Sequence, residues 1–187
     1  MTQQAEPQQA GPQQQDPQEA DPQQPGIRAL AVTVSTRAAA GVYQDRSGPA
    51  LAALLAGAGC QVDGPIVIPD GDPVEQALRT AVAAGYDVVV TTGGTGLTPT
   101  DVTPELTRRV IDRDIPGIAE ALRAAGIAAG VPAAMLSRGI AGLAGRTLIV
   151  NLPGSAGAVR DAAAVLGPVI SHAVEQVRGE GHHGPPV

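Results

Sequence analysis

The sequence predicts an α/β domain with a mainly parallel sheet that helices cover on both faces. Three observations predict it. Short β-branched apolar runs alternate with amphipathic or alanine-rich segments, proline and glycine stand where one pattern changes into the other, and the apolar runs are continuous, as in strands buried on both faces. With 43% hydrophobic residues among 187, the chain can bury one sizeable core, so we expect one domain.

We expect that domain over residues 27–178. Residues 1–26 consist almost entirely of Gln, Pro, Ala, Asp and Glu, lack apolar periodicity and are typical of a disordered tail. Residues 179–187 follow the last apolar period and predict a flexible C-terminal tail. A frayed end explains His182 and His183 there better than a metal site does.

The first half of the domain alternates strand and helix around a polar loop at residues 36–47. Pro49 suits the first turn of a helix that Gly59 ends, and Asp72 suits the N-cap of the next helix. The predicted elements are strands at residues 27–35 and 61–68, and helices at residues 49–58 and 73–84.

The second half continues the alternation. Thr103 suits an N-cap with Pro104 at the first helical position, and Gly167-Pro168 is expected to break the last helical stretch in two. Residues 132–139 fit no single pattern. The predicted elements are strands at residues 86–92 and 146–152, and helices at residues 103–112, 116–129, 155–165 and 168–177.

Composition excludes several classes of function. The net charge of −6 argues against nucleic-acid and anionic-membrane partners, and the absence of Trp and Phe removes aromatic platforms for stacking bases. All basic side chains are arginine, so a P-loop lysine, a Schiff base and a lysine general base are excluded.

Cys60 is the only cysteine and is expected to be a small buried hydrophobe. No run reaches membrane-spanning length, and we expect a cytoplasmic protein.

The stretch from Val88 to Glu105, VVVTTGGTGLTPTDVTPE, predicts a buried strand that opens into a binding loop. The glycines Gly93, Gly94 and Gly96 allow positive φ angles, with which backbone amides can curl around an anion. The hydroxyls of Thr92, Thr95 and Thr98 add donors. A purely structural turn explains the same glycines equally well.

Two aspartates follow predicted strands on the edge where ligands bind in parallel sheets. Asp70 and Asp101 could hold Mg²⁺, which prefers one or two carboxylates together with waters and phosphate oxygens. The structural alternatives are a turn-forming Asp70 and an Asx-type turn at Asp101.

A second corner, at Asn151–Ser155, runs from a strand into a helix N-terminus, where free amides and the helix dipole suit a phosphate. An ordinary corner with Ser155 as N-cap is the structural alternative. The residues with a predicted binding role in this corner are Asn151, Pro153, Gly154 and Ser155.

Six segments in this order resemble the molybdopterin-binding Mog/MoaB family, which includes molybdopterin adenylyltransferases and the G domain of gephyrin. They are GVYQDRSGPAL (41–51), IPDGD (68–72), TTGGTGLTPTDVTPE (91–105), DRDIPGIAEALR (112–123), LSRGIAG (136–142) and NLPGS (151–155). The resemblance runs from about Ile27 to Arg178.

The resemblance implies a three-layer α/β/α sandwich, mostly parallel with one antiparallel strand, that assembles as a homotrimer. It implies Mg²⁺-dependent transfer of AMP from ATP to the terminal phosphate of molybdopterin, with release of pyrophosphate. Asp70 and Asp101 would be the metal-binding and catalytic carboxylates, Thr92–Gly96 and the 151–155 corner would hold phosphates, and Ser137 would contact the pterin. The insertase that later delivers molybdenum would be a separate protein.

One departure supports a second hypothesis, a molybdopterin carrier without transfer chemistry. Thr36 stands where many relatives carry an acidic residue.

With lysine absent, we expect at least one of Arg37, Arg46 and Arg138 to contact phosphate. His172 lies in the last predicted helix, far from the loops, and is expected to be structural.

Overall fold

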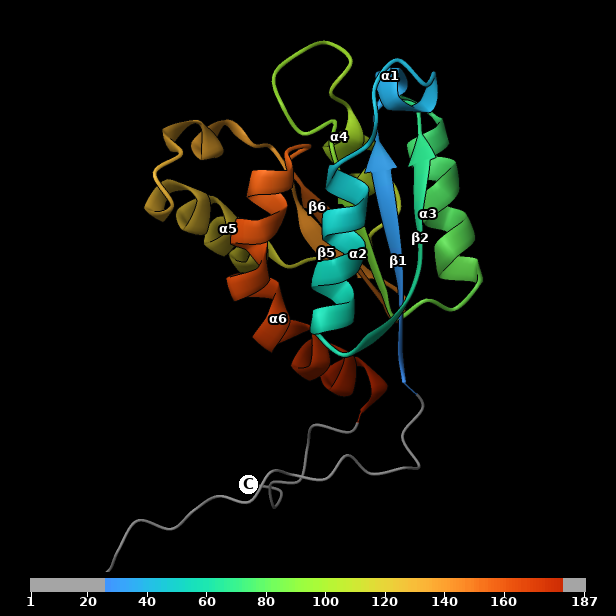
Figure 1. Ribbon diagram of the computed structural model, residues 1–187. Helices are drawn as coiled ribbons and strands as arrows, with labels where there is room; N and C mark the ends of the chain where they lie inside the picture. Colours follow the sequence, from blue (N-terminus) through green and yellow to red (C-terminus); the bar gives the residue numbers. More distant parts are fainter. Residues whose placement is uncertain (1–25, 180–187) are drawn as a thin grey trace, which may run out of the picture.

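The computed structural model describes residues 26–179, so the predictions for residues 1–25 and 180–187, His182 and His183 included, lie outside the described residues. Within them the chain forms one six-stranded sheet with the order β2-β1-β3-β6-β5-β4 (Figure 1). The strands are β1 (Ile27–Val34), β2 (Cys60–Ile68), β3 (Val88–Thr92), β4 (Arg113–Asp114), β5 (Ala141–Ala144) and β6 (Thr147–Leu152).

The sheet is mostly parallel. Strand β1 pairs in parallel with β2 and β3, and β3 pairs in parallel with β6. Strand β5 pairs antiparallel with both β6 and β4, so β5 alone runs against the other strands of the described sheet. The prediction of a mostly parallel sheet with one antiparallel strand is confirmed.

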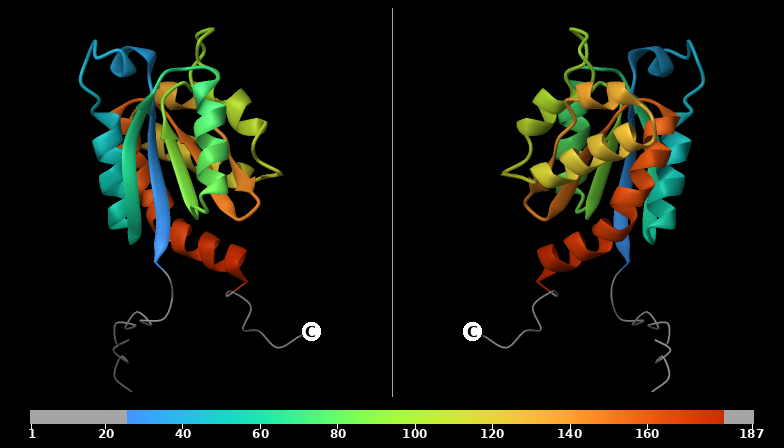
Figure 2. Two further views of the ribbon diagram at one scale, coloured as in Figure 1. Left: turned by 90° about the vertical axis from the view of Figure 1, so that its right-hand side faces the viewer. Right: turned by 90° about the vertical axis from the view of Figure 1, so that its left-hand side faces the viewer.

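Helices cover both faces of the sheet, which gives three layers (Figures 1 and 2). Alternate residues of β1 point to opposite sides: Ala29 and Ala31 join the core under α2, α5 and α6, and Leu30 and Val32 join the core under α3 and α4. The helices are α1 (Thr36–Ala39), α2 (Ser47–Gly57), α3 (Pro73–Ala83), α4 (Thr103–Arg108), α5 (Pro116–Ala128), the 3₁₀ turn η1 (Pro132–Leu136) and α6 (Ala156–Arg178).

The last helix corrects one prediction. Helix α6 continues through Gly167-Pro168, so the expected break into two helices was wrong. Leu166 and Ile170 are fully buried on either side of Pro168, and their packing offsets the hydrogen bond that proline removes. Helix α5 likewise contains a glycine, Gly126, and continues past it to Ala128.

Two helix starts also differ from the prediction. Thr103 is the first residue of α4 and makes no side-chain cap bond, and the helix ends at Arg108 instead of Asp112. Asp72 occupies the N-cap position of α3, but its carboxylate caps no amide. The predicted loop at residues 36–47 contains the short helix α1, which Ser35 caps by accepting a hydrogen bond from the Ala38 amide at 3.3 Å.

Cys60 is buried, and burial together with the charge of Asp87 raises the pKa of its thiol, as expected of an inert structural cysteine. No helix between residues 26 and 179 combines the length and the apolar character needed to cross a membrane.

Candidate active site

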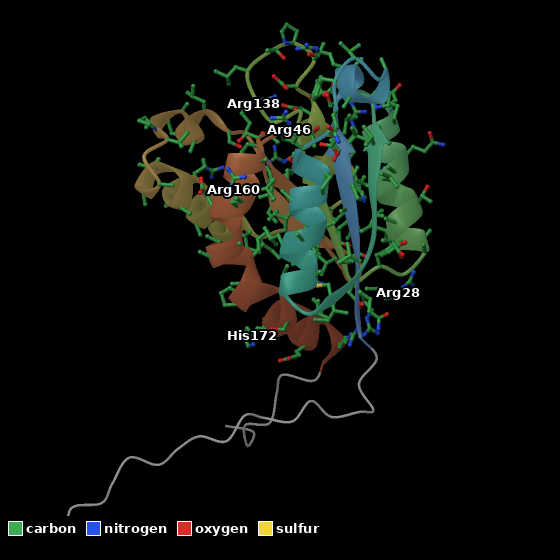
Figure 3. All side chains as sticks on the ribbon, viewed as in Figure 1. Arg28, Arg46, Arg138, Arg160 and His172 are labelled. Carbon is green, nitrogen blue, oxygen red and sulfur yellow. The ribbon has the colours of Figure 1, made fainter. Side chains whose placement is uncertain are left out.

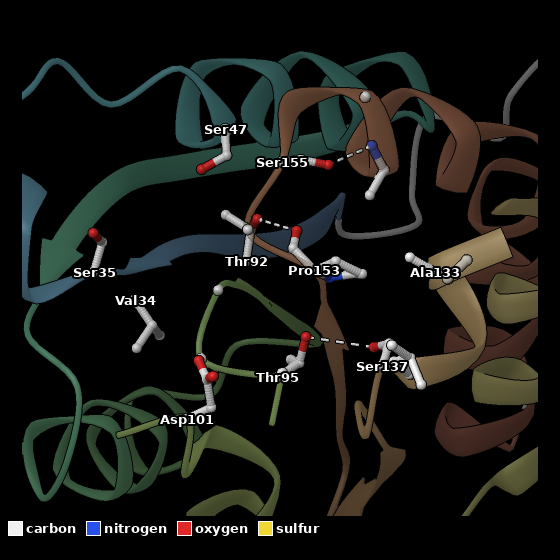
Figure 4. Close-up of a pocket in the computed structure, with 18 of the residues that line it drawn as sticks. Val34, Ser35, Ser47, Thr92, Thr95, Asp101, Ala133, Ser137, Pro153 and Ser155 are labelled. Carbon is white, nitrogen blue, oxygen red and sulfur yellow. Dashed lines mark hydrogen bonds between the residues drawn. The ribbon is translucent and has the colours of Figure 1, made fainter. Parts of the chain in front are cut away.

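A cavity of about 700 Å³ opens at the carboxyl ends of β1, β3 and β6 (Figure 4). Its wall is made by four connections that are far apart in the sequence (β1 to α2, β2 to α3, β3 to α4, and β6 to α6) and by the segment from the end of α5 through η1 to Ser137. The predicted site residues that line it are Asp70, Thr92, Gly93, Gly94, Thr95, Gly96, Asp101, Ser137, Pro153, Gly154 and Ser155. The fold therefore brings together eleven of these twelve predicted site residues, all but Asn151, whereas Thr98 and the candidate arginines Arg37, Arg46 and Arg138 do not line the cavity.

The glycine turn after β3 forms the floor of the cavity. Gly93 has a φ of 110°, and a Cβ there would lie 2.1 Å from the Val34 carbonyl oxygen, so a side chain is excluded on two grounds. The Gly93 amide donates to the Leu152 carbonyl at 3.0 Å. Within the described part of the chain, the next three amides, at Gly94, Thr95 and Gly96, have no partner. These three amides are free to bind an anion.

Asp70 reaches the same turn from the end of β2. Its Oδ2 accepts hydrogen bonds from the Thr36 amide at 3.0 Å and the Thr36 hydroxyl at 2.7 Å. Its Oδ1 lies on the other side, 3.1 Å from the point where a Cβ of Gly94 would stand. Thr36, the position that departs from the family pattern, thus holds one carboxylate oxygen and leaves the other facing the glycine turn.

Asp101 approaches the turn from the opposite side. Its Oδ2 accepts hydrogen bonds from the Thr98 amide at 2.9 Å and the Thr98 hydroxyl at 2.5 Å, so a residue three positions earlier in the chain holds the carboxylate. A Cβ at Gly96 would lie 2.9 Å from this oxygen. The two bare glycines, Gly94 and Gly96, are what allow Asp70 and Asp101 to approach the loop so closely.

The corner between β6 and α6 closes the cavity. The Thr92 hydroxyl donates to the Pro153 carbonyl at 2.8 Å, and Ser155 caps α6 by accepting from the Ala158 amide at 3.1 Å (Figure 4). A Cβ at Gly154 would lie 3.2 Å from the Gly93 Cα, so the two glycine-bearing corners touch. The positive end of the 23-residue helix α6 therefore faces the same space as the free amides.

Asn151 does not line this cavity. Its side chain is buried and donates to the hydroxyls of Thr91 and Thr107, at 3.0 Å each, while its Oδ1 accepts from the Ile140 amide at 3.3 Å. These bonds join β6 to β3 and α4. The structure places Asn151 as a tie behind the cavity floor, at the start of the corner that carries Pro153 and Gly154.

The loop after η1 supplies Ser137 and Arg138. The Ser137 hydroxyl donates to the Thr95 hydroxyl at 3.4 Å (Figure 4), and Arg138 Nε donates to the Gly96 carbonyl at 2.7 Å. The other two guanidinium nitrogens of Arg138 bind the Asp101 carbonyl and Glu105. Arg138 therefore clamps the loop that bears Asp101, and its guanidinium is engaged within the protein.

The other candidate arginines differ. Arg37 stacks over the ring of Tyr43 at 5.3 Å, and Arg46 is exposed. Arg46 and Arg138 lie at the end of the molecule that holds the cavity, whereas His172 lies near the opposite end (Figure 3). His172 is exposed on α6, where its Nε2 lies 3.1 Å from the Gln176 side-chain nitrogen, so its structural role stays a prediction.

The sequence reasoning missed a polar wall between β1 and α2. The Ser35 and Tyr43 hydroxyls are 2.8 Å apart, and Ser47 is buried against the cavity; Asp161 of α6 also lines it. The only signal was that Tyr43 and Ser47 fall in one of the six family-like segments.

Asp45 supports this wall. Burial alone would raise the pKa of its carboxyl, but hydrogen bonds from the Gly48 amide, the Thr33 hydroxyl and Ser47 together hold that pKa below its usual value of 3.8. Asp45 is therefore a carboxylate that anchors the start of α2.

The residues present fit a divalent cation that shares its coordination with a phosphate ligand. Between residues 26 and 179, no three acidic, histidine or cysteine side chains gather to hold a metal by themselves. Mg²⁺ needs fewer, since one or two carboxylates suffice beside phosphate and water. Asp70 against Gly94 and Asp101 against Gly96 provide that donor set beside the glycine turn, and the nearby buried hydroxyl of Thr103 has no partner.

Comparison with known proteins agrees with this geometry. Residues 30–172 match the family described as a probable molybdopterin binding domain. The molybdopterin adenylyltransferase of Haemophilus influenzae is 44% identical over 137 residues, which cover 70% of this chain and 68% of that protein. The molybdenum cofactor biosynthesis bifunctional protein of Chlorobaculum tepidum is 39% identical over 157 residues, 83% of this chain, but the chain spans only 50% of that protein.

Solved structures share the fold. The molybdopterin biosynthesis Mog protein of Mycobacterium ulcerans superposes with a TM-score of 0.78 at 47% identity, covering 83% of this chain and 99% of that one. The molybdopterin biosynthesis enzyme MoaB of Thermus thermophilus gives a TM-score of 0.76 at 42% identity, covering 82% of this chain and 97% of that one.

Proposed function

Because the chain belongs to the probable molybdopterin-binding domain family and thus to molybdenum cofactor biosynthesis, we propose that it transfers AMP from ATP to the terminal phosphate of molybdopterin and releases pyrophosphate. The observation that carries the proposal is a single cavity that combines two carboxylates, three free amides and a helix N-terminus. Its volume of about 700 Å³ suits small-molecule ligands.

Adenylyl transfer is an in-line displacement at the α-phosphorus between two anionic groups, so the protein mainly supplies position and charge neutralisation. The amides of Gly94, Thr95 and Gly96 would donate to phosphate oxygens, and the N-terminus of α6 would face a second phosphate. Asp70 and Asp101 would hold Mg²⁺, which neutralises the triphosphate and the leaving pyrophosphate.

The attacking phosphate is already ionised, so the reaction needs no general base. In keeping with this, no histidine or cysteine is found among the described residues that line the cavity. Ser137, hydrogen-bonded to Thr95, would contact the pterin beside the glycine turn, as the family resemblance implies.

The second candidate is a molybdopterin carrier that performs no transfer. Thr36 motivates it, because at this position the chain offers a hydroxyl to Asp70 instead of a further carboxylate. Structures named MoaB share the fold as well as structures named Mog, so the fold is compatible with both candidates.

One assay separates them. The protein is incubated with molybdopterin, ATP and Mg²⁺, and pyrophosphate is measured; release refutes the carrier, and bound pterin without release refutes the transferase. We predict that Asp101→Asn lowers turnover at least about 100-fold, because the charge is lost at the site of charge neutralisation. The amide oxygen can still accept from Thr98, so the fold should remain.

Asp72→Asn is the matched control. It makes the same chemical change on an exposed residue beside Asp70 whose carboxylate caps no amide, so turnover should be unchanged. An Asp101→Asn protein as active as Asp72→Asn would contradict the catalytic assignment.

A further inference from the structure

A buried hydroxyl beside the cavity lacks a partner. Thr103, the first residue of α4, is 0% exposed, and among the described residues its Oγ1 alone is a buried side-chain polar atom without a hydrogen bond. Buried polar groups in folded proteins are nearly always paired, so an orphan of this kind calls for a water or a ligand.

The position of the hydroxyl suggests what it serves. A Cβ at Gly94 would lie 2.2 Å from Thr103 Oγ1 and 3.1 Å from Asp70 Oδ1, so both oxygens face the same bare glycine. They are therefore no more than about 5 Å apart, and a side-chain rotation could bring them within hydrogen-bonding distance. The Thr103 amide donates to the Gly94 carbonyl at 3.1 Å, which fixes this end of α4 against the turn.

Asp70 has one oxygen to spare at this place. The amide and hydroxyl of Thr36 occupy Oδ2, whereas Oδ1 accepts no hydrogen bond within the described residues. A carboxylate with hydrogen bonds to only one of its two oxygens can still rotate. A second contact is therefore needed to hold the other oxygen in the direction of a cation.

We propose that Thr103 is a positioning residue of the cation site, whose hydroxyl donates to Asp70 Oδ1 when the cation is bound and so aims this carboxylate at the divalent cation. The inference rests on the proposed function, because it assigns to Thr103 the support of the same cation site.

The proposal predicts that removing the Thr103 hydroxyl leaves the stability of the free protein unchanged or raises it, while it lowers the affinity of the protein for the cation. Thr103→Val keeps the shape of the side chain and removes an unpaired buried hydroxyl, so the free protein should melt at the same temperature or up to about 2–4 °C higher. The affinity for Mn²⁺, used as the probe, should fall about tenfold, as for other groups that orient metal ligands. Thr103→Ser keeps the hydroxyl and should retain the affinity.

Thr107→Val is the matched control on the same helix. Thr107 is also 0% exposed, but its hydroxyl accepts a hydrogen bond from Asn151 at 3.0 Å. Its removal should lower the melting temperature by a few degrees and leave Mn²⁺ affinity unchanged.

The full chain and the three variants are titrated with Mn²⁺ in the presence of a saturating non-hydrolysable ATP analogue, with free Mn²⁺ measured by electron paramagnetic resonance against a titration of the analogue alone, and are melted without metal. Equal Mn²⁺ affinity in the wild type and Thr103→Val overturns the role of Thr103 and leaves the proposed function intact. A Thr103→Val protein that loses stability or fails to fold overturns it as well, since the hydroxyl then has a protein partner. A wild type without any Mn²⁺ site overturns the cation site itself and this inference with it.

Discussion

Gly94 has a positive φ angle, lines the cavity and lies against the first residue of α4, so a side chain at this position would meet three separate constraints. Its φ is 63°, and a Cβ would lie 2.2 Å from Thr103 Oγ1 and 3.1 Å from Asp70 Oδ1. A glycine elsewhere in the chain offers a comparison: Gly41 has a φ of 70° and would place a Cβ in open space. Comparing substitutions at Gly41 and Gly94 therefore separates the free-energy cost of a positive φ angle from the cost of placing a methyl group against Thr103 and Asp70.

We predict that Gly41→Ala destabilises the protein by about 1 kcal/mol, the cost of positive φ for a residue with a Cβ. Gly94→Ala should destabilise it by clearly more, because Thr103 and Asp70 must also move, and should abolish pyrophosphate release. Chemical denaturation and the transfer assay measure both effects. Equal stability of the two variants would show that the turn can relax around the new methyl group.

At this scale the sequence could predict positions but not contacts. Asp70 and Asp101 were predictable because each follows a strand, and the apolar runs in the sequence indicate where the strands end. That Thr36 holds one oxygen of Asp70 depends on a contact between residues 34 positions apart, and no local pattern encodes it. The same holds for Arg138, one of three arginines of which at least one was expected to contact phosphate, which is bound instead to the Gly96 and Asp101 carbonyls.

At the scale of elements, the strands with long apolar runs were predicted and the short ones were missed. Strand β4 is two exposed polar residues, and β5 is Ala-Gly-Leu-Ala without a β-branched side chain, so neither carries a strand signal of its own. Their pairing with each other and with β6 makes them strands. Helix α6 shows the converse, since burial of Leu166 and Ile170 overrides the local signal of Pro168.

Helix α2 gives a prediction in which pH reports on a helix start. It begins at Ser47, before the predicted Pro49, because Asp45 Oδ1 accepts the amides of Ser47 and Gly48 at 2.9 and 3.0 Å. Asp45→Ala should destabilise the protein at pH 7 by about 0.5–2 kcal/mol, the usual value of such a cap.

The pH dependence follows from the lowered pKa of Asp45. The unfolded chain carries a carboxyl with the usual value of 3.8 and the folded chain one below it, so the stabilisation is fully present above 3.8 and is lost as pH falls through the folded pKa. The stability difference between wild type and Asp45→Ala, from urea unfolding at several pH values, should therefore shrink on acidification. A constant difference would assign the effect to packing.

At the scale of the whole molecule, the site is an assembly of loops from four strands, and its parts meet only when the sheet is in register. The strand order β2-β1-β3-β6 places the ends of these strands side by side. The sequence predicted this convergence because parallel strands end at one edge. It could not predict Asn151 behind the floor or Thr103 beside it, since both depend on how α4 packs against β6.

The homotrimer stays a prediction. It comes from the family resemblance, and one feature agrees with it: the α5–η1 segment exposes Ile127 and Met135, which an association of protomers could cover, whereas its exposed Val131 and Leu136 line the cavity. Light scattering should give three times the chain mass of 18.7 kDa. The mass of a single chain would contradict the trimer.

The two ends of the described chain have a consequence for fusion proteins. Strand β1 starts and α6 finishes at the edge of the sheet opposite the cavity (Figures 1 and 2), where Arg178 pairs with Asp87 at 3.0 Å and reaches the Gly26 carbonyl at 3.4 Å. A reporter or a second catalytic module joined directly to residue 26 or residue 179 would leave from that edge. Its linker would need to run the length of the sheet before it could obstruct substrate entry.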